Sequence, residues 1–284
     1  MTAAATGDAL TVLMGARRYR VERPWGELPL DLGFVALSQI AVDSNGRVYA
    51  YRRADPPVLV FEPSGAFRCA WGEGRIADAH GIYVSADDRV FLVDRDAHEV
   101  LIFTTEGEAL GSLGRRNLPS FQAPFNHPTD VAVAGDGEIY VSDGYANAAV
   151  HRFAADGRHL ATWGTPGSGP GQFMTPHAIW VDGRDRVLVV DRDNNRVQLF
   201  DRDGGWLGAW TDFFHPMDIC ADDQGMLLVS DQVPRLSMYA PDGSLAGRCR
   251  GSWNGAHGIF ANATGDLFLA EMHPNRITKL SVIR

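Results

Sequence analysis

The segment His177–Thr211 has the sequence HAIWVDGRDRVLVVDRDNNRVQLFDRDGGWLGAWT. It contains four short runs rich in valine, leucine, isoleucine and aromatic residues, separated by turns that contain aspartate and glycine. Such runs and turns are typical of short strands joined by tight hairpins. No helical spacing of apolar residues competes with this pattern. The segment therefore predicts a unit of four antiparallel strands.

Five further copies of this unit follow one another along the chain. They begin near Ser38, His80, Thr129, Met217 and His257. Four short strands per unit, at a period of about 40 residues, are the signature of a β-propeller blade. The chain is thus predicted to be all-β and to form a six-bladed β-propeller.

The last unit lacks its fourth strand. The segment Tyr19–Trp25, YRVERPW, is similar to the fourth strands of other units, such as FRCAW and HLATW. We expect it to close the ring by completing the last blade, because closure hides both free sheet edges. Residues 17–284 would then form one propeller, and residues 1–16 would be a flexible leader that lacks the basic segment of a signal peptide.

Composition and charge exclude several classes of partner. The chain has 26 Lys and Arg against 35 Asp and Glu, a net charge of −9, which argues against nucleic acid. No apolar run approaches the roughly 18 residues of a membrane helix. The cysteines, Cys69, Cys220 and Cys249, are far apart and form no CxxC pair. They indicate free thiols in a reducing compartment, so we expect a cytoplasmic protein.

One repeat position carries histidine in every second unit. In chain order its residues are Ser38, His80, Thr129, His177, Met217 and His257. Alternate blades of a six-fold ring lie about 120° apart, and the first strand of each blade lines the central channel. His80, His177 and His257 should therefore converge on the axis as ligands of one divalent metal ion. Zinc is the first expectation and iron is possible.

The other six histidines are expected to be structural or solvent-exposed: His98, His127, His151, His159, His215 and His273.

A second repeat position, just after the second strand, should surround the three histidines. Its residues are Arg53, Arg95, Gly144, Arg192, Gln232 and Met272, and Tyr145 follows Gly144. Three arginines beside a cation indicate a small anionic ligand, whose carboxylate guanidinium groups would hold. The alternative is pairing with the local acids Asp94, Asp96, Asp191 and Asp193, above all for Arg95.

The blade pattern resembles the NHL-repeat family, in Asn126–Pro128, Phe214–Pro216 and Asp191–Val197. The site residues resemble the catalytic domain of peptidyl-α-hydroxyglycine α-amidating lyase (peptidylamidoglycolate lyase). The similar segments are Tyr51–Arg53, Ala79–Gly81, Val141–Asn147, Pro170–Ala178, Val190–Arg192 and Ala256–Gly258.

This resemblance implies a metal-dependent lyase that cleaves a carbinolamide or related α-hydroxy acid and releases a carbonyl product such as glyoxylate. It implies zinc on the three histidines, Tyr145 as general base next to Arg53, and Arg53 and Arg192 as catalytic residues that hold the substrate carboxylate. Arg95 would be an additional substrate-binding residue.

The chain departs from that family at three positions. Gly258 stands where the family has the aspartate of its structural calcium site, which argues against calcium here. Gly255 replaces a methionine and leaves more room in the pocket. Ala146 replaces a disulfide cysteine. A different metal-dependent hydratase or lactonase-type hydrolase therefore stays open, although lactonases prefer carboxylate ligands. A non-catalytic interaction platform is also open, because propellers host many functions.

Overall fold

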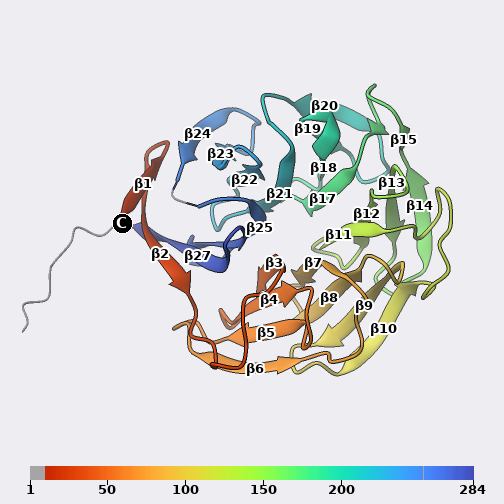
Figure 1. The fold of residues 1–284 in the computed structure, drawn as a ribbon. Helices are drawn as coiled ribbons and strands as arrows, with labels where there is room; N and C mark the ends of the chain where they lie inside the picture. Colours follow the sequence, from red (N-terminus) through yellow and green to blue (C-terminus); the bar gives the residue numbers. More distant parts are fainter. Residues whose placement is uncertain (1–9, 252) are drawn as a thin grey trace, which may run out of the picture.

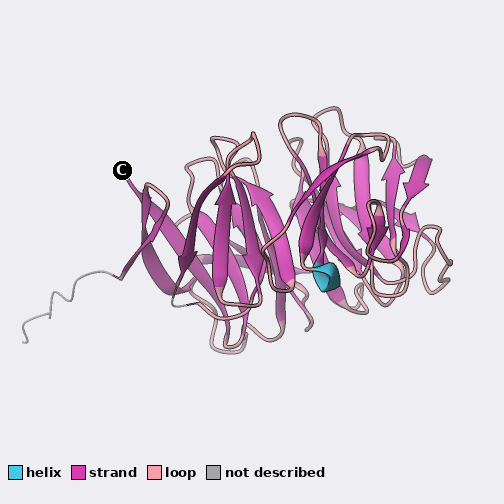
Figure 2. Cartoon of the chain, turned by 90° about the horizontal axis from the view of Figure 1, so that it is seen from above, coloured by secondary structure: helices cyan, strands magenta, loops and turns pink. Residues whose placement is uncertain are grey.

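The computed structural model of the chain describes residues 10–251 and 253–284. Figure 1 shows their sheets arranged as blades around a central axis. Five sheets have four strands and a sixth has five, which confirms the predicted six-bladed propeller. Within the described residues, the one helical element is a short turn, η1 (Arg192–Asn194), visible in Figure 2. None of these residues belongs to a helix that is long and apolar enough to cross a membrane.

The blades follow one another along the chain. Blade 1 consists of β3 (Leu37–Val42), β4 (Val48–Arg52), β5 (Val58–Phe61) and β6 (Phe67–Trp71), and blade 2 of β7 (Ala79–Val84), β8 (Arg89–Asp94), β9 (Glu99–Thr104) and β10 (Ala109–Gly114). Blade 3 consists of β11 (Pro128–Val133), β12 (Ile139–Asp143), β13 (Ala149–Phe153) and β14 (His159–Trp163). A small pair, β15 (Thr165–Pro166) and β16 (Gln172–Phe173), precedes blade 4, which consists of β17 (Pro176–Val181), β18 (Val187–Asp191), β19 (Arg196–Phe200) and β20 (Trp206–Trp210). Blade 5 consists of β21 (Pro216–Ala221), β22 (Leu227–Asp231), β23 (Arg235–Tyr239) and β24 (Leu245–Arg250). Blade 6 contains β25 (Ala256–Ala261), β26 (Leu267–Met272) and β27 (Asn275–Ile283).

The core lies between neighbouring blades. All six residues of β3 and of β11 are buried, whereas the outer strand β14 is mostly exposed. Phe91 of blade 2 packs in one cluster with Val131 and Val141 of blade 3. Both faces of the inner strands are covered in this way, so their sequences are continuous apolar runs.

The sheet of blade 6 also contains strands from the N-terminal end of the chain. β2 (Arg17–Trp25) pairs antiparallel with β27, and β1 (Thr11–Met14) pairs with β2. The sequence predicted a flexible leader over residues 1–16. The structure differs from that prediction in the part of this segment that it describes, and residues 1–9 lie outside that part. Thr11–Met14 form a strand because Gly15 allows a hairpin and Met14 is fully buried.

Candidate metal centre

The inner strands of blades 2, 4 and 6 begin with a shift in strand register, and a histidine lies at each shift. The strand pairing shifts register between Ala79 and Ile82, between Pro176 and Ala178, and between Ala256 and Gly258. A shift of this kind leaves a residue out of the ladder and redirects its side chain. His80, His177 and His257 are the residues at these shifts.

The three imidazoles face one another on the axis of the propeller. Their ring centroids are 4.9 Å apart for His80 and His177, 5.1 Å for His80 and His257, and 5.0 Å for His177 and His257. One ring nitrogen of each lies within 4.8 Å of the others, and all three side chains are buried. Among residues 10–251 and 253–284, this is the one group of three or more such side chains that could hold a metal ion.

Each imidazole is fixed by a main-chain carbonyl of the next blade. The Nδ1 atoms of His80, His177 and His257 lie 2.6, 2.7 and 2.7 Å from the oxygens of Thr129, Met217 and Ser38, respectively. A carbonyl only accepts hydrogen bonds, so each Nδ1 carries the proton and each Nε2 offers a lone pair. This tautomer is the one that a metal site on Nε2 requires. Thr129, Met217 and Ser38 occupy the same repeat position as the histidines, so odd-numbered blades supply acceptors and even-numbered blades supply ligands.

Burial keeps these imidazoles uncharged. It lowers the pKa of His257 to about 4, and nearby Arg53 adds to that shift. The pKa values of His80 and His177 fall well below their usual range, first by burial and then by repulsion between the rings. Neutral rings with free lone pairs fit a borderline metal such as zinc.

Tyr145 lies at the mouth of the histidine cluster, on the segment after β12. Its hydroxyl is 2.9 Å from Nε2 of His80 and 3.1 Å from Nε2 of His177. The preceding residue has to be small, because a Cβ at Gly144 would lie 2.0 Å from the carbonyl oxygen of Pro176. The close approach of two blades at Gly144 thus brings Tyr145 beside His177.

The three arginines surround this mouth, and each is held by its Nε. Arg53 Nε donates to the carbonyl of Ala79 at 3.0 Å, Arg95 Nε to Asp96 at 2.9 Å and Arg192 Nε to Asp193 at 2.9 Å. The Nη atoms of Arg53 and Arg95 make no hydrogen bond to any other residue that the structure describes. Asp96 and Asp193 are therefore partners of two arginines, as the alternative interpretation expected. The Nη atoms of Arg53 and Arg95 remain available to an anion.

Two arginines lie over the ring of Tyr145. The guanidinium carbons of Arg95 and Arg192 lie 5.4 and 5.5 Å from the centre of its ring, and Arg192 Nη1 is 3.4 Å from its hydroxyl. Arg53, which was expected next to Tyr145, donates through its Nε to the carbonyl of Ala79, the residue before His80.

Sequence reasoning missed Asp78, which joins two of the arginines. Its carboxylate oxygens lie 3.4 Å from Nε of Arg53 and 3.0 Å from Nε of Arg95. The equivalent residue of blade 4 is Thr175, whose hydroxyl donates to Asp193 at 2.6 Å and so supports Arg192 indirectly. The signal was present, because both residues stand two positions before a histidine.

At the third such position, two residues before His257, stands Gly255. A Cβ there would have nothing within 4 Å, in keeping with the expected extra room. Gly258 is different, because a Cβ there would lie 1.9 Å from Oε1 of Gln39. Gln39 fills the space that an aspartate at position 258 would need, so these residues do not fit the family's calcium site.

Comparisons with known proteins agree with the architecture. The family described as a 6-bladed beta-propeller matches residues 123–231. NHL repeat-containing protein 3 of Homo sapiens is 34% identical over 233 residues, which cover 74% of this chain and 67% of the human protein. Peptidyl-alpha-hydroxyglycine alpha-amidating lyase 1 of Drosophila melanogaster is 30% identical over 64% of this chain, but the match spans only 34% of the fly protein.

A solved structure shares the fold. The virginiamycin B lyase of Staphylococcus aureus, with quinupristin, superposes with a TM-score of 0.67 over 92% of this chain and 85% of the bacterial chain. Sequence identity is 16%, so the likeness concerns the architecture alone.

Proposed function

This chain belongs to the NHL-repeat β-propeller family, and we propose that it is a metal-dependent lyase acting on a small α-hydroxy acid of the carbinolamide type. One observation carries the proposal. Three tethered imidazoles direct unprotonated Nε2 atoms toward one another, two of them, those of His80 and His177, lie within hydrogen-bond distance of the Tyr145 hydroxyl, and three arginines lie nearby. Similarity to the fly lyase supports it.

The donor set fits zinc, with iron as the second possibility, held by His80, His177 and His257. A bound zinc ion would act as a Lewis acid toward the substrate hydroxyl. Arg53 and Arg192, with Arg95 beside them, would bind the substrate carboxylate through their Nη atoms. This arrangement would orient the hydroxyl-bearing carbon above the histidines.

Tyr145 is the residue placed to take the hydroxyl proton. Positive charge on Arg95 and Arg192 above its ring would stabilise the negative charge that develops on its oxygen. The electron pair of the O–H bond then forms the C=O bond, the C–N bond breaks, and the proton ends on the amide nitrogen. The products are an amide and glyoxylate, so the reaction balances without an oxidant or a second substrate.

The structure also has three free cysteines, Cys69, Cys220 and Cys249, in keeping with a reducing compartment. We place the proposed activity in the cytoplasm, without a nucleic-acid or membrane partner.

The test compares the purified protein with its His80→Ala/His177→Ala/His257→Ala variant. We expect about one equivalent of metal in the parent protein and none in the variant, measured by elemental analysis. We also expect glyoxylate from N-acetyl-α-hydroxyglycine with the parent protein only. Equal metal content in the parent protein and the variant would favour a non-catalytic interaction platform. Bound metal without glyoxylate would point to a different hydratase or hydrolase.

A further inference from the structure

Asp143 ends the second strand of blade 3 and holds the segment that carries Tyr145. Its carboxylate is fully buried and accepts the backbone N–H of Asn126 at 2.9 Å and the side-chain amide of Asn147 at 2.8 Å. It also lies 3.1 Å from Nε2 of His151 on the third strand, β13. Because a carboxylate only accepts hydrogen bonds, Nε2 of His151 is the donor in this contact. Tyr145 lies between Asp143 and Asn147 in the chain, so these contacts hold both ends of its segment.

The His151 side chain is buried and is held from its other side as well. Its Nδ1 lies 2.8 Å from the hydroxyl oxygen of Thr162 on the outer strand β14. The ring of Phe125, from the connector before β11, meets it edge-on, with the ring centroids 5.4 Å apart. His151 thus links the outer strand of blade 3 to the end of its second strand.

The same position of the third strand carries different side chains in the six blades. In chain order its residues are Leu59, Leu101, His151, Gln198, Ser237 and Thr278. Gln198 Nε2 donates to Asp191 at 3.1 Å, and the hydroxyl of Thr278 donates to Glu271. An amide and a hydroxyl group therefore do in blades 4 and 6 what the imidazole does in blade 3. The shared property is a side-chain donor that satisfies a buried carboxylate.

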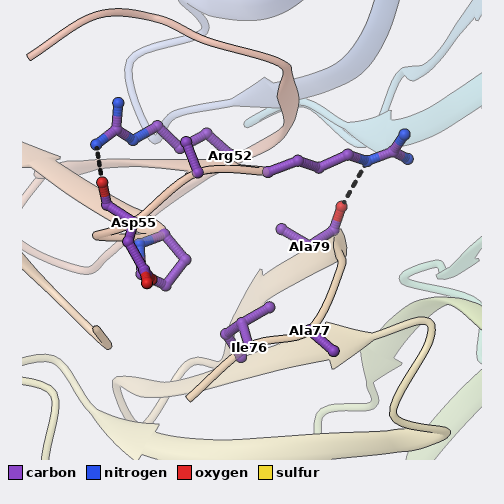
Figure 3. Close-up of a pocket in the computed structure, with 8 residues that line it drawn as sticks. Arg52, Asp55, Ile76, Ala77 and Ala79 are labelled. Atoms are coloured by element: carbon purple, nitrogen blue, oxygen red, sulfur yellow. Dashed lines mark hydrogen bonds between the residues drawn. The ribbon is translucent and has the colours of Figure 1, made fainter. Parts of the chain in front are cut away.

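Blades 1 and 2 have leucine at this position and satisfy the end of the second strand differently. In blade 1 the equivalent of the acid is Arg52, which donates to three main-chain oxygens, among them that of Asp55 (Figure 3). In blade 2, Asp94 accepts three backbone N–H groups. The fold therefore accommodates leucine on the third strand, and the effect of losing a donor falls on the acid beside it.

We propose that His151 is a positioning residue for Tyr145. Its Nε2–H group fixes the carboxylate of Asp143, and this carboxylate fixes the segment from which the Tyr145 hydroxyl reaches the histidine cluster. The inference rests on the proposed function for the role of Tyr145 as general base. The position of Tyr145 can nevertheless be measured without activity, so the two proposals fail separately.

The test follows Tyr145 by fluorine NMR in protein labelled with fluorotyrosine, in which Tyr145→Phe identifies its resonance. His151→Leu removes the donor, and we expect the Tyr145 resonance to shift. His151→Gln supplies the donor that blade 4 uses at this position, and its Tyr145 resonance should match that of the parent protein. Thr162→Val, at an exposed position of β14, removes the hydroxyl that orients the imidazole and should shift the resonance in the same direction as His151→Leu.

Glyoxylate release measures the consequence for the proposed reaction. We expect kcat to fall by roughly tenfold or more in His151→Leu, because a displaced base reacts slowly, whereas KM should change little because the arginines are untouched. His151→Gln should restore most of kcat.

Thr278→Val is the matched control, since it removes an equivalent buried donor from the strand-end acid of blade 6, and it should leave the Tyr145 resonance unchanged. An unchanged resonance in both His151→Leu and Thr162→Val, an equal shift in Thr278→Val, or a His151→Gln resonance that resembles that of His151→Leu would each overturn the positioning role. Absence of glyoxylate with the parent protein would instead contradict the lyase proposal and leave the NMR result standing.

Discussion

The hydroxyl group of Tyr145 lies within hydrogen-bond distance of two candidate metal ligands, His80 and His177. Tyr145→Phe removes this hydroxyl and keeps the ring beneath Arg95 and Arg192. Because the phenol is the proposed general base, we expect turnover to fall by roughly 10²-fold or more. Metal content should not change, since the ligands are histidines. Glyoxylate release and elemental analysis measure the two quantities, and full activity in the variant would exclude Tyr145 as the base.

Asp78 is a positioning residue in this proposal, because it acts on substrate only through Arg53 and Arg95. Asp78→Asn removes the negative charge that lies beside both Nε groups, 3.4 Å from that of Arg53 and 3.0 Å from that of Arg95. We expect KM to rise about tenfold while kcat changes little, the pattern of lost uniform binding. Asp87→Asn breaks another arginine–aspartate pair, with Arg89 at 2.8 Å in the hairpin between β7 and β8, and should leave KM unchanged. A fall in kcat alone for Asp78→Asn would contradict this role.

The repeat made part of the site predictable at this scale. His80, His177 and His257 could be compared at one position in six copies, and the structure brings them together. The direction of a long side chain cannot be predicted in this way. Whether Arg53 or Arg95 lies over Tyr145 depends on where Asp78 and Ala79 offer acceptors, which is a property of the folded connectors.

At the scale of elements, buried acids at the ends of the second strands hold the segments that lead into the site. Asp94 accepts the backbone N–H groups of Ala77 and Asp78, at 2.8 and 3.0 Å, and Asp191 accepts that of Met174 at 2.8 Å. These hydrogen bonds satisfy groups that would otherwise be unpaired near the core. Asp94 and Asp191 therefore order the entry to β7 and β17, although sequence reasoning considered them partners of the site arginines.

The Gly144→Ala variant tests whether β12 and β17 have to approach each other closely. Gly144→Ala places a methyl group against the backbone of Pro176, which cannot move without shifting His177. We expect the free energy of unfolding to fall by about 1–3 kcal/mol, as in overpacked sites, and metal content to decrease. Urea denaturation and elemental analysis measure these effects. Gly183→Ala, where a Cβ has nothing within 4 Å, is the matched control, and an equal loss in both variants would count against the argument.

The sequence did not predict strand β1. Val12 and Met14 face the core and Thr11 and Leu13 are exposed, but Leu13 is itself apolar, so the sequence TVLM shows no alternation of apolar and polar residues. Tertiary packing supplies what the local pattern lacks. A Cβ on Gly15 would lie 2.6 Å from the carbonyl oxygen of Ala246, so the β1–β2 turn is in close contact with β24 of blade 5.

At the scale of the whole molecule, the bore beneath the histidines contains two fully buried carboxyl groups, Asp130 and Asp218. Burial raises the pKa of Asp218 to about 7, and the pKa of Asp130 is raised well above its usual range. An unfolded aspartate titrates near 3.9, so between about pH 4 and pH 7 the folded protein holds protons that the unfolded chain has released. The contribution of this pair to stability should therefore decrease as pH rises through that window.

Asp218→Asn removes one of these titrations. We expect the free energy of unfolding, measured in urea at pH 5 and pH 8, to depend less on pH in the variant than in the parent protein. The variant should be less stable at pH 5, because the hydrogen bonds from Ile219 and Ile259 to the carboxyl group are disturbed. Identical pH dependence in the two proteins would show that Asp218 ionises normally in the fold.

Six-fold repetition made the architecture predictable, because each copy repeats the same strand and turn signals. The sheet of blade 6 combines two distant segments instead. β2 pairs with β27, and Tyr19 and Val21 pack in one cluster with Leu269 and Leu280 of blade 6.

Deleting residues 1–26 removes β1 and β2 and exposes the edge of β27 together with that cluster. Burial of a single large apolar side chain contributes roughly 1.5–3 kcal/mol, and Tyr19 and Trp25 are both buried. Because each blade packs on its two neighbours, we expect a lower melting temperature for the entire domain, with faster hydrogen exchange in blade 3 as well as in blade 6. A synthetic peptide of residues 10–26, added in trans, should restore much of the loss. An unchanged melting temperature, or faster exchange confined to blade 6, would mean that the propeller is stable without a strand from its N-terminal end.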